Sequence, residues 1–260
     1  MKISRKFCIF AALVCIAVLV PLEIFRPAPF SSENLNKSFF TIITRLIGAA
    51  LFLLLNIYLE HDILKPKYAF SRHALWALPC LIVAINNLPS VALLRGDAKI
   101  SGGALDIIMF ALECLFVSLF EELAFRGVAF LSILKMRQGK KWLFASIIIS
   151  SVVFGLFHVV NLIYGAGFGE TALQMGYSAL VGAMCAFALY KTGSIWICVL
   201  IHSVYNFCGQ IVPRLGGGDM LNAPQIIITV IISVICAIYI VLSLIKAAPT
   251  ESDRLYKVQE

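Results

Sequence analysis

The chain has 260 residues, of which 61% are hydrophobic and only 13% are charged, whereas about 25% of the residues of globular domains carry a charge. This balance excludes an ordinary soluble protein and predicts an integral membrane protein. The net charge of +7 arises from basic residues scattered between apolar runs. That pattern orients membrane proteins, and it does not favour binding to nucleic acid.

Apolar runs long enough to span a bilayer recur along the chain, so we expect an all-α polytopic membrane protein rather than a β-barrel. The first run, Cys8–Phe25, follows three basic residues like a signal peptide, but no convincing cleavage site follows it, so we interpret it as a retained span. The other runs are Phe39–Leu59, Leu75–Leu94, Ala104–Leu134, Trp142–Tyr164, Ala172–Tyr190, Ser194–Val212 and Gln225–Ile245. They predict about eight transmembrane helices in a single domain, 1–260.

The fourth run contains the charged sequence F-E-E-L-A-F-R, from Phe120 to Arg126. Because the chain stays apolar beyond Arg126, we expect one tilted helix of about 31 residues with a bend at Gly127. Most of the 21 lysines and arginines fall on the side that carries both chain ends. The positive-inside rule therefore predicts cytoplasmic termini, and we assign the protein to the cell membrane.

The two loop histidines, a run of three glycines and the cysteines receive purely structural interpretations. His61 and His73 lie in a hydrophilic loop, where we expect solvated side chains, and Gly216–Gly218 is interpreted as a loop. All eight cysteines fall within apolar runs and none forms a C-x-x-C pair. Buried thiols are therefore expected, rather than disulfides or a cysteine-based zinc site.

Polar residues recur four positions apart on three of the apolar segments. The pairs are Glu122 and Arg126, Phe154 and His158, and His202 and Asn206. Residues four apart share one face of a helix, so each segment presents a polar face, and all three faces could turn toward a common cavity. A charged side chain in a membrane helix is costly and usually serves a function.

Each pair also has a purely structural interpretation. Glu122 and Arg126 can neutralise each other, Phe154 can simply pack against an imidazole, and a histidine or Asn206 can join helices by hydrogen bonds. Glu121, however, has no obvious local partner in the sequence. Together with two histidines and an amide on otherwise apolar segments, it favours a shared reactive site.

The residue types in this set are those of a hydrolase. A carboxylate and a neutral imidazole can hold and deprotonate a water, while a second imidazole and an amide can stabilise the oxyanion that forms on a carbonyl. Two histidines and one glutamate also suffice for a catalytic zinc, which would make Glu121, His158 and His202 the ligands. The H-E-x-x-H sequence of zincins is absent.

The three motifs together resemble those of a known family. E-E-L-A-F-R is similar to an E-E-x-x-x-R motif, F-G-L-F-H to F-x-x-x-H, and H-S-V-Y-N to H-x-x-x-N. These motifs, in this order, belong to the CPBP (CAAX protease and bacteriocin-processing, or Abi) intramembrane endopeptidases, which include the Rce1-type CAAX prenyl proteases. The resemblance implies an eight-helix fold with a catalytic core at about residues 104–212.

The resemblance also implies residue roles. Glu121 would be the general base, assisted by His158, while His202 and Asn206 would stabilise the oxyanion. Glu122 and Arg126 match the motif and would orient the site, with Phe154 as a supporting residue. The family has been described both as metalloproteases and as glutamate proteases. We favour the second description, with no required cofactor, because Asn206 stands where a further zinc ligand would be expected.

The expected substrate is a membrane-embedded or lipidated protein or peptide. Prenylated CAAX proteins and bacteriocin precursors both remain open. One alternative is a non-catalytic membrane partner or immunity protein that regulates another membrane protein. A second is a small transporter with Glu113, Glu121, Glu122 and Arg45 as a proton or ion path, although the sequence shows no inverted repeat and no sign of broken helices.

Overall fold

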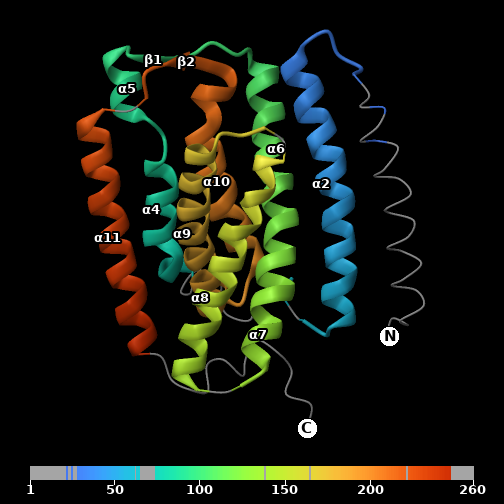
Figure 1. Ribbon diagram of the computed structural model, residues 1–260, viewed down its shortest axis with the longest axis vertical. Helices are drawn as coiled ribbons and strands as arrows, with labels where there is room; N and C mark the ends of the chain where they lie inside the picture. The colour runs from blue at the N-terminus through green and yellow to red at the C-terminus, as the bar shows by residue number, and fades with distance from the viewer. Residues whose placement is uncertain are drawn as a thin grey trace.

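The computed structural model describes residues 22, 25, 28–61, 63–64, 74–137, 139–163, 165–220 and 222–246. The expected first span, Cys8–Phe25, falls almost wholly outside this part of the chain, as do His73, Cys8 and Cys15. The described residues fold into a bundle of roughly parallel and antiparallel helices (Figure 1). The predicted all-α polytopic membrane fold is thereby confirmed.

Five of the described helices are long and apolar enough to cross a membrane, so the expected count of about eight spans is not confirmed. They are α2 (Glu33–Tyr58), α8 (Lys140–Phe157) with the 3-10 turn η3 (His158–Leu162), α9 (Phe168–Thr192), α10 (Ile195–Leu215) and α11 (Ala223–Ile245). Side chains next to the helix ends can cap the unpaired backbone N–H groups there. Asn222, for example, caps α11 by accepting a hydrogen bond from the N–H of Gln225 at 3.0 Å.

The expected span Leu75–Leu94 is not one helix. A 3-10 turn η1 (Leu75–Ala77) leads into α4 (Leu78–Asn86), and a separate short helix α5 (Ser90–Arg95) follows. The break falls at Pro89, which has no N–H to donate and disfavours a helical residue before it. Gln225 compensates by donating from its amide to the carbonyls of Asn86 at 3.1 Å and Leu88 at 3.3 Å.

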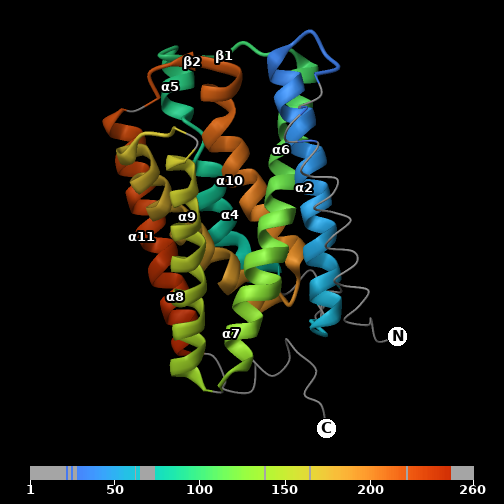
Figure 2. The same ribbon diagram turned by 45° about the vertical axis from the view of Figure 1, so that its right-hand side comes forward.

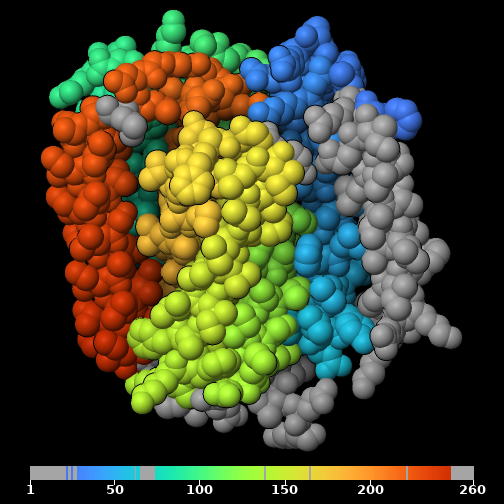
Figure 3. Space-filling model, viewed as in Figure 1, coloured from blue at the N-terminus to red at the C-terminus, as the bar shows by residue number. Residues whose placement is uncertain are grey.

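The expectation of unbroken spans is therefore wrong at this position. In the space-filling view, α4 lies at the bottom of a furrow between α11 and the block formed by α8 and α9 (Figure 3).

The expected long fourth helix is confirmed as one continuous segment. It consists of α6 (Ala104–Glu122), a π-helix η2 (Leu123–Phe130) and α7 (Leu131–Lys135). Gly127, where a bend was expected, lies inside this π-helix, and the bend itself stays a prediction. Asn56 donates to the carbonyl of Leu123 at 2.9 Å, and Nδ1 of His61 lies 2.7 Å from the carbonyl of Gly127.

His61 is thus buried, with only 6% of its surface exposed, which corrects the expected solvated histidine. A buried carbonyl without a partner would be costly, and the imidazole supplies the missing donor. Burial lowers the pKa of His61 to about 4, to which the nearby charge of Lys135 also contributes. The neutral ring can therefore donate to Gly127 at physiological pH.

A two-stranded antiparallel ribbon closes one end of the bundle, where β1 (Ala98–Ile100) pairs with β2 (Gly216–Gly218). The expected loop at Gly216–Gly218 is therefore a strand. Glycine is required at two of its positions because a Cβ at Gly216 or Gly218 would collide with the backbone of β1. The six described cysteines are free, and all but the half-buried Cys208 are buried, as the sequence predicted.

α2 and α6 lie side by side in both views of the bundle (Figure 1 and Figure 2). The absence of a side chain at Gly48 makes room for the ring of Phe120 between them. Glu113 on α6 accepts a hydrogen bond from Ser38 on α2 at 2.7 Å and pairs with Arg214 on α10 at 3.3 Å. These polar contacts join three helices around the site described next.

Candidate active site

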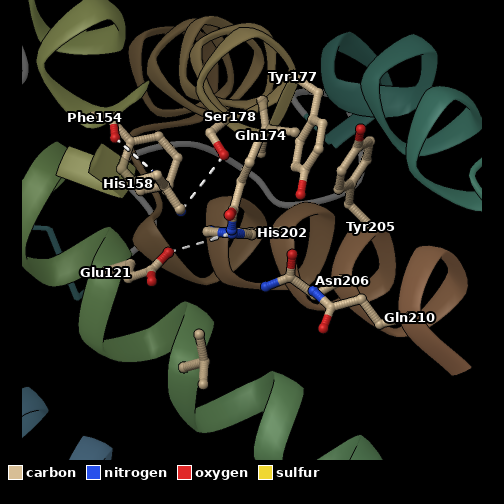
Figure 4. A pocket seen from close by; sticks show the side chains of 12 residues that line it. Glu121, Phe154, His158, Gln174, Tyr177, Ser178, His202, Tyr205, Asn206 and Gln210 are labelled. Carbon is tan, nitrogen blue, oxygen red and sulfur yellow. Dashed lines mark hydrogen bonds and ion pairs between the residues drawn. The ribbon is translucent and has the colours of Figure 1, made fainter. Parts of the chain in front are cut away.

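Two of the three polar faces predicted from the sequence, those of His158 and of His202 with Asn206, converge with Glu121 on one cavity of about 90 Å³, which Glu122 and Arg126 do not line (Figure 4). It is enclosed by residues from α6, from the junction of α8 and η3, from α9 and from α10. They are Val117, Glu121, Phe154, His158, Gln174, Tyr177, Ser178, Val181, His202, Tyr205, Asn206 and Gln210. Glu121, His158, His202 and Asn206 are thus brought together within the bundle.

His202 stands between the two adjacent carboxylates of α6. Its Nδ1 is 2.7 Å from Oε1 of Glu122, and its Nε2 is 3.5 Å from Oε2 of Glu121. An ionised carboxylate only accepts hydrogen bonds, so His202 can donate to both only when both ring nitrogens carry a proton. The contact with Glu122 is short and fixes the ring. The contact with Glu121 is long and weak, so Nε2 can serve another acceptor in its place.

Glu122 and Arg126 form the ion pair that the sequence offered as their structural interpretation. Oε2 of Glu122 is 2.9 Å from Nε of Arg126, and both side chains are almost completely buried. The guanidinium carbon lies 4.4 Å from the centre of the Phe154 ring, which provides a cation–π contact. Phe154 also meets both imidazoles edge-on, at ring-centre distances of 5.2 Å for His158 and 5.6 Å for His202.

His158 occupies the point where α8 tightens into η3. Its Nδ1 is 3.1 Å from the carbonyl of Phe154, which fixes the ring, and its Nε2 is 3.5 Å from Oγ of Ser178. His158 and Glu121 line the same cavity without a direct contact between them (Figure 4). This arrangement leaves space for a small molecule such as water between an imidazole and a carboxylate.

Asn206 lies one turn after His202 on α10 and lines both this cavity and an adjoining one of about 150 Å³. The sequence interpretation missed the contribution of α9, which supplies Gln174, Tyr177 and Ser178 to the wall. Their spacing of three and four residues places them on one helix face, and this was the signal that could have identified them.

The candidate zinc ligands do not fit a metal in this arrangement. Both nitrogens of His202 face carboxylates, and Nε2 of His158 faces a serine hydroxyl. Across the described residues, no group of three or more His, Cys, Asp or Glu side chains is arranged to hold a metal ion. We therefore derive no step through a metal, and metal independence stays a prediction.

Residues 103–208 match the family model described as type II CAAX prenyl endopeptidase Rce1-like. The matched segment runs from the start of α6 into α10 and contains every residue of the three sequence motifs. No curated protein and no solved structure matches the chain.

Proposed function

The chain belongs, through residues 103–208, to the Rce1-like family of type II CAAX prenyl endopeptidases, and from this premise we propose that it is an intramembrane endopeptidase. Its substrate is a membrane-associated or lipidated protein or peptide. The family description favours a prenylated CAAX sequence over a bacteriocin precursor. The observation that carries the proposal is the convergence of Glu121, His158, His202 and Asn206 on one cavity among membrane-spanning helices.

In the proposed reaction, a water held between Glu121 and His158 attacks the carbonyl carbon of the scissile peptide. Glu121 accepts the proton that the water loses as the new C–O bond forms. With a proton on each ring nitrogen, His202 donates from Nδ1 to Glu122 and from Nε2 to the resulting oxyanion, and the side-chain amide of Asn206 donates a second hydrogen bond to that oxyanion. Glu121 then passes the proton to the leaving amine as the C–N bond breaks, which regenerates the carboxylate.

Glu122, Arg126 and Phe154 hold this arrangement without touching the substrate. Glu122 fixes His202 through Nδ1, and the buried Arg126 holds the other carboxylate oxygen of Glu122. The short contact determines which ring nitrogen is directed at the cavity. Because each of these groups is buried and paired, the orientation of His202 is set before any substrate arrives.

The test uses the purified chain in liposomes with a quenched fluorescent peptide that ends in a farnesylated CAAX sequence. Glu121→Gln removes the base with almost no change of shape, and we expect cleavage to fall by roughly 10³ or more, by analogy with other general bases and their partners. His158→Ala should cause a loss of at least roughly 10². The matched control is Glu170→Gln, which changes an exposed glutamate of α9 outside the cavity.

Full cleavage by both the Glu121→Gln and His158→Ala variants would remove the proposed mechanism. A second arm adds a strong chelator to the wild-type protein, which should retain most of its activity. Complete loss that only zinc restores would instead favour a metalloprotease. A bacteriocin-precursor peptide in the same assay decides between the two substrate classes.

A further inference from the structure

Arg45 lines a second cavity that opens directly on the candidate active site. Arg45 lies within α2, one of the membrane-spanning helices. The second cavity has a volume of about 340 Å³ and shares Glu121, His158 and Gln174 with the first. Its other lining residues are Arg45, Phe120, Phe157, Val160 and Asn161. A substrate bound at Glu121 can therefore extend toward a cation.

Arg45 differs from Arg126 and Arg214 because it has no polar partner in the part of the chain that the structure describes. Arg126 pairs with Glu122 and Arg214 pairs with Glu113. No hydrogen bond or ion pair joins Arg45 to another residue within the described ranges, and its Nε is buried without a partner. Its guanidinium carbon lies 5.3 Å from the centre of the Phe120 ring. A cation at this depth is costly unless an anion or a polar ligand compensates it.

The cavities that continue in the other direction from the site contain no charged residue. The next one is formed by Asn87, Tyr177, Tyr205, Asn206, Gly209 and Gln210. A further apolar one of about 280 Å³ lies beyond it, between the end of α4 and α11. The active site therefore has a cationic side and an uncharged side, which distinguishes the two ends of a bound peptide.

We propose that Arg45 binds a carboxylate of the peptide substrate and so positions the scissile bond at Glu121. This inference rests on the proposed endopeptidase function and deepens it. Two carboxylates are compatible with the chemistry, namely the C-terminal carboxylate of a short leaving fragment and an acidic side chain. Asn161 donates to Oε1 of Gln174 at 2.8 Å, and both side chains line the cavity that contains Arg45.

The experiment measures binding, so that it does not depend on cleavage. The full-length protein in nanodiscs is titrated with the tripeptide Val-Ile-Met as its free acid, with the C-terminal amide of that tripeptide, and with the amide of Val-Asp-Met. The wild-type protein should bind the free acid roughly 10- to 100-fold more tightly than its amide, as expected for a charge-assisted hydrogen bond. Tight binding of the Val-Asp-Met amide would identify an acidic side chain as the second source.

The variants separate ligand binding from a structural role. Arg45→Gln should bind acid and amide equally, while Arg45→Lys should keep part of the preference because it retains the charge without the planar guanidinium. Arg95→Gln, which changes an exposed arginine of α5, should keep all of it.

Equal binding of all three peptides by the wild-type protein, or failure to bind any of them, would overturn the proposal. A preference that survives in Arg45→Gln would do the same. The titration is repeated in Glu121→Gln, so that peptide binding is measured without cleavage. If the wild-type protein cleaves no peptide, only the proposed function is contradicted. The ratio of the acid affinity to the amide affinity decides the role of Arg45.

Discussion

Glu121 and Glu122 follow one another in α6, but their carboxylates lie in different surroundings. Glu122 is fully buried and is held on one side by Arg126 and on the other by His202. Glu121 is 14% exposed, and its one polar contact with another described residue is the long one to His202 at 3.5 Å. The comparison teaches that the two sides of His202 differ. Glu122 and Arg126 form a fixed support, here called the support side, whereas Glu121 faces the cavity on the open side. The predictions below test this difference.

The largest effect is expected on the support side. Arg126→Met leaves the buried Glu122 without its cation, and breaking a buried pair in this way costs about 3 to 5 kcal/mol of folding stability. Glu121→Gln, on the open side, should change the stability by less than about 0.5 kcal/mol. Thermal unfolding in detergent measures both. Equal stability of the two variants would show that the sides do not differ as described.

On the open side, the expected effect is on turnover. Asn206→Ala removes an oxyanion donor, so kcat should fall by roughly 10² to 10³, while the binding of the Val-Ile-Met tripeptide stays nearly the same. Cys208→Ala, on the same helix but outside the cavity lining, is the control and should leave both quantities unchanged. A weaker tripeptide affinity with normal kcat would assign Asn206 to binding instead.

The π-helix that follows the two carboxylates gives a second test of the support side. A Cβ at Gly127 would lie 2.5 Å from Oδ1 of Asn56, so Gly127→Ala must displace the side chain that pairs with the carbonyl of Leu123. We expect a loss of about 1 to 3 kcal/mol in the free energy of unfolding. The control is Gly176→Ala in α9, where a Cβ meets open space and should stabilise by about 0.5 to 1 kcal/mol.

The smallest expected effect is on the pH dependence of folding stability, through His61, which contacts the π-helix at Gly127. The pKa of His61 is lowered to about 4 in the folded state from its ordinary 6.5. Between these values the unfolded chain binds a proton that the folded chain does not, so stability falls as the pH drops from 6.5 toward 4. His61→Gln should lose this contribution. Parallel stability curves for variant and wild type across that window would contradict the assignment.

The sequence identified the site residues whose polar side chains are energetically costly to place in a membrane. Two carboxylates and two histidines inside apolar segments need partners, so their spacing already indicated a shared cavity. The structure brings Glu121 and both histidines to one, and Glu122 supports His202 from outside its lining. Arg45 was also visible as a charge within a span. Its position beside the site, however, depends on how α2 packs against α6, which no local pattern specifies.

The features that the sequence did not reveal depend on backbone groups or on uncharged side chains. Gln174 and Ser178 are ordinary residues for a membrane helix, and only the rotation of α9 turns them toward the cavity. Pro89 was visible, but the length and apolar character of the run concealed the break that it makes. His61 lies in a hydrophilic stretch and is nevertheless buried because the π-helix exposes a carbonyl that needs a donor.

The π-helix also has a consequence for insertions and deletions. A π turn contains about one residue more than an α turn, so it shifts the phase of the helix on either side of it. Deleting one residue between Leu123 and Phe130 would therefore restore an ordinary α-helix with little change of phase, whereas winding the same number of residues as an α-helix would rotate everything after them by about 100°. Leu131 and Leu134, which are 0% and 2% exposed, would then leave the core. The extra residue lets a single helix direct Glu121 into the cavity and, two turns later, still bury an apolar face.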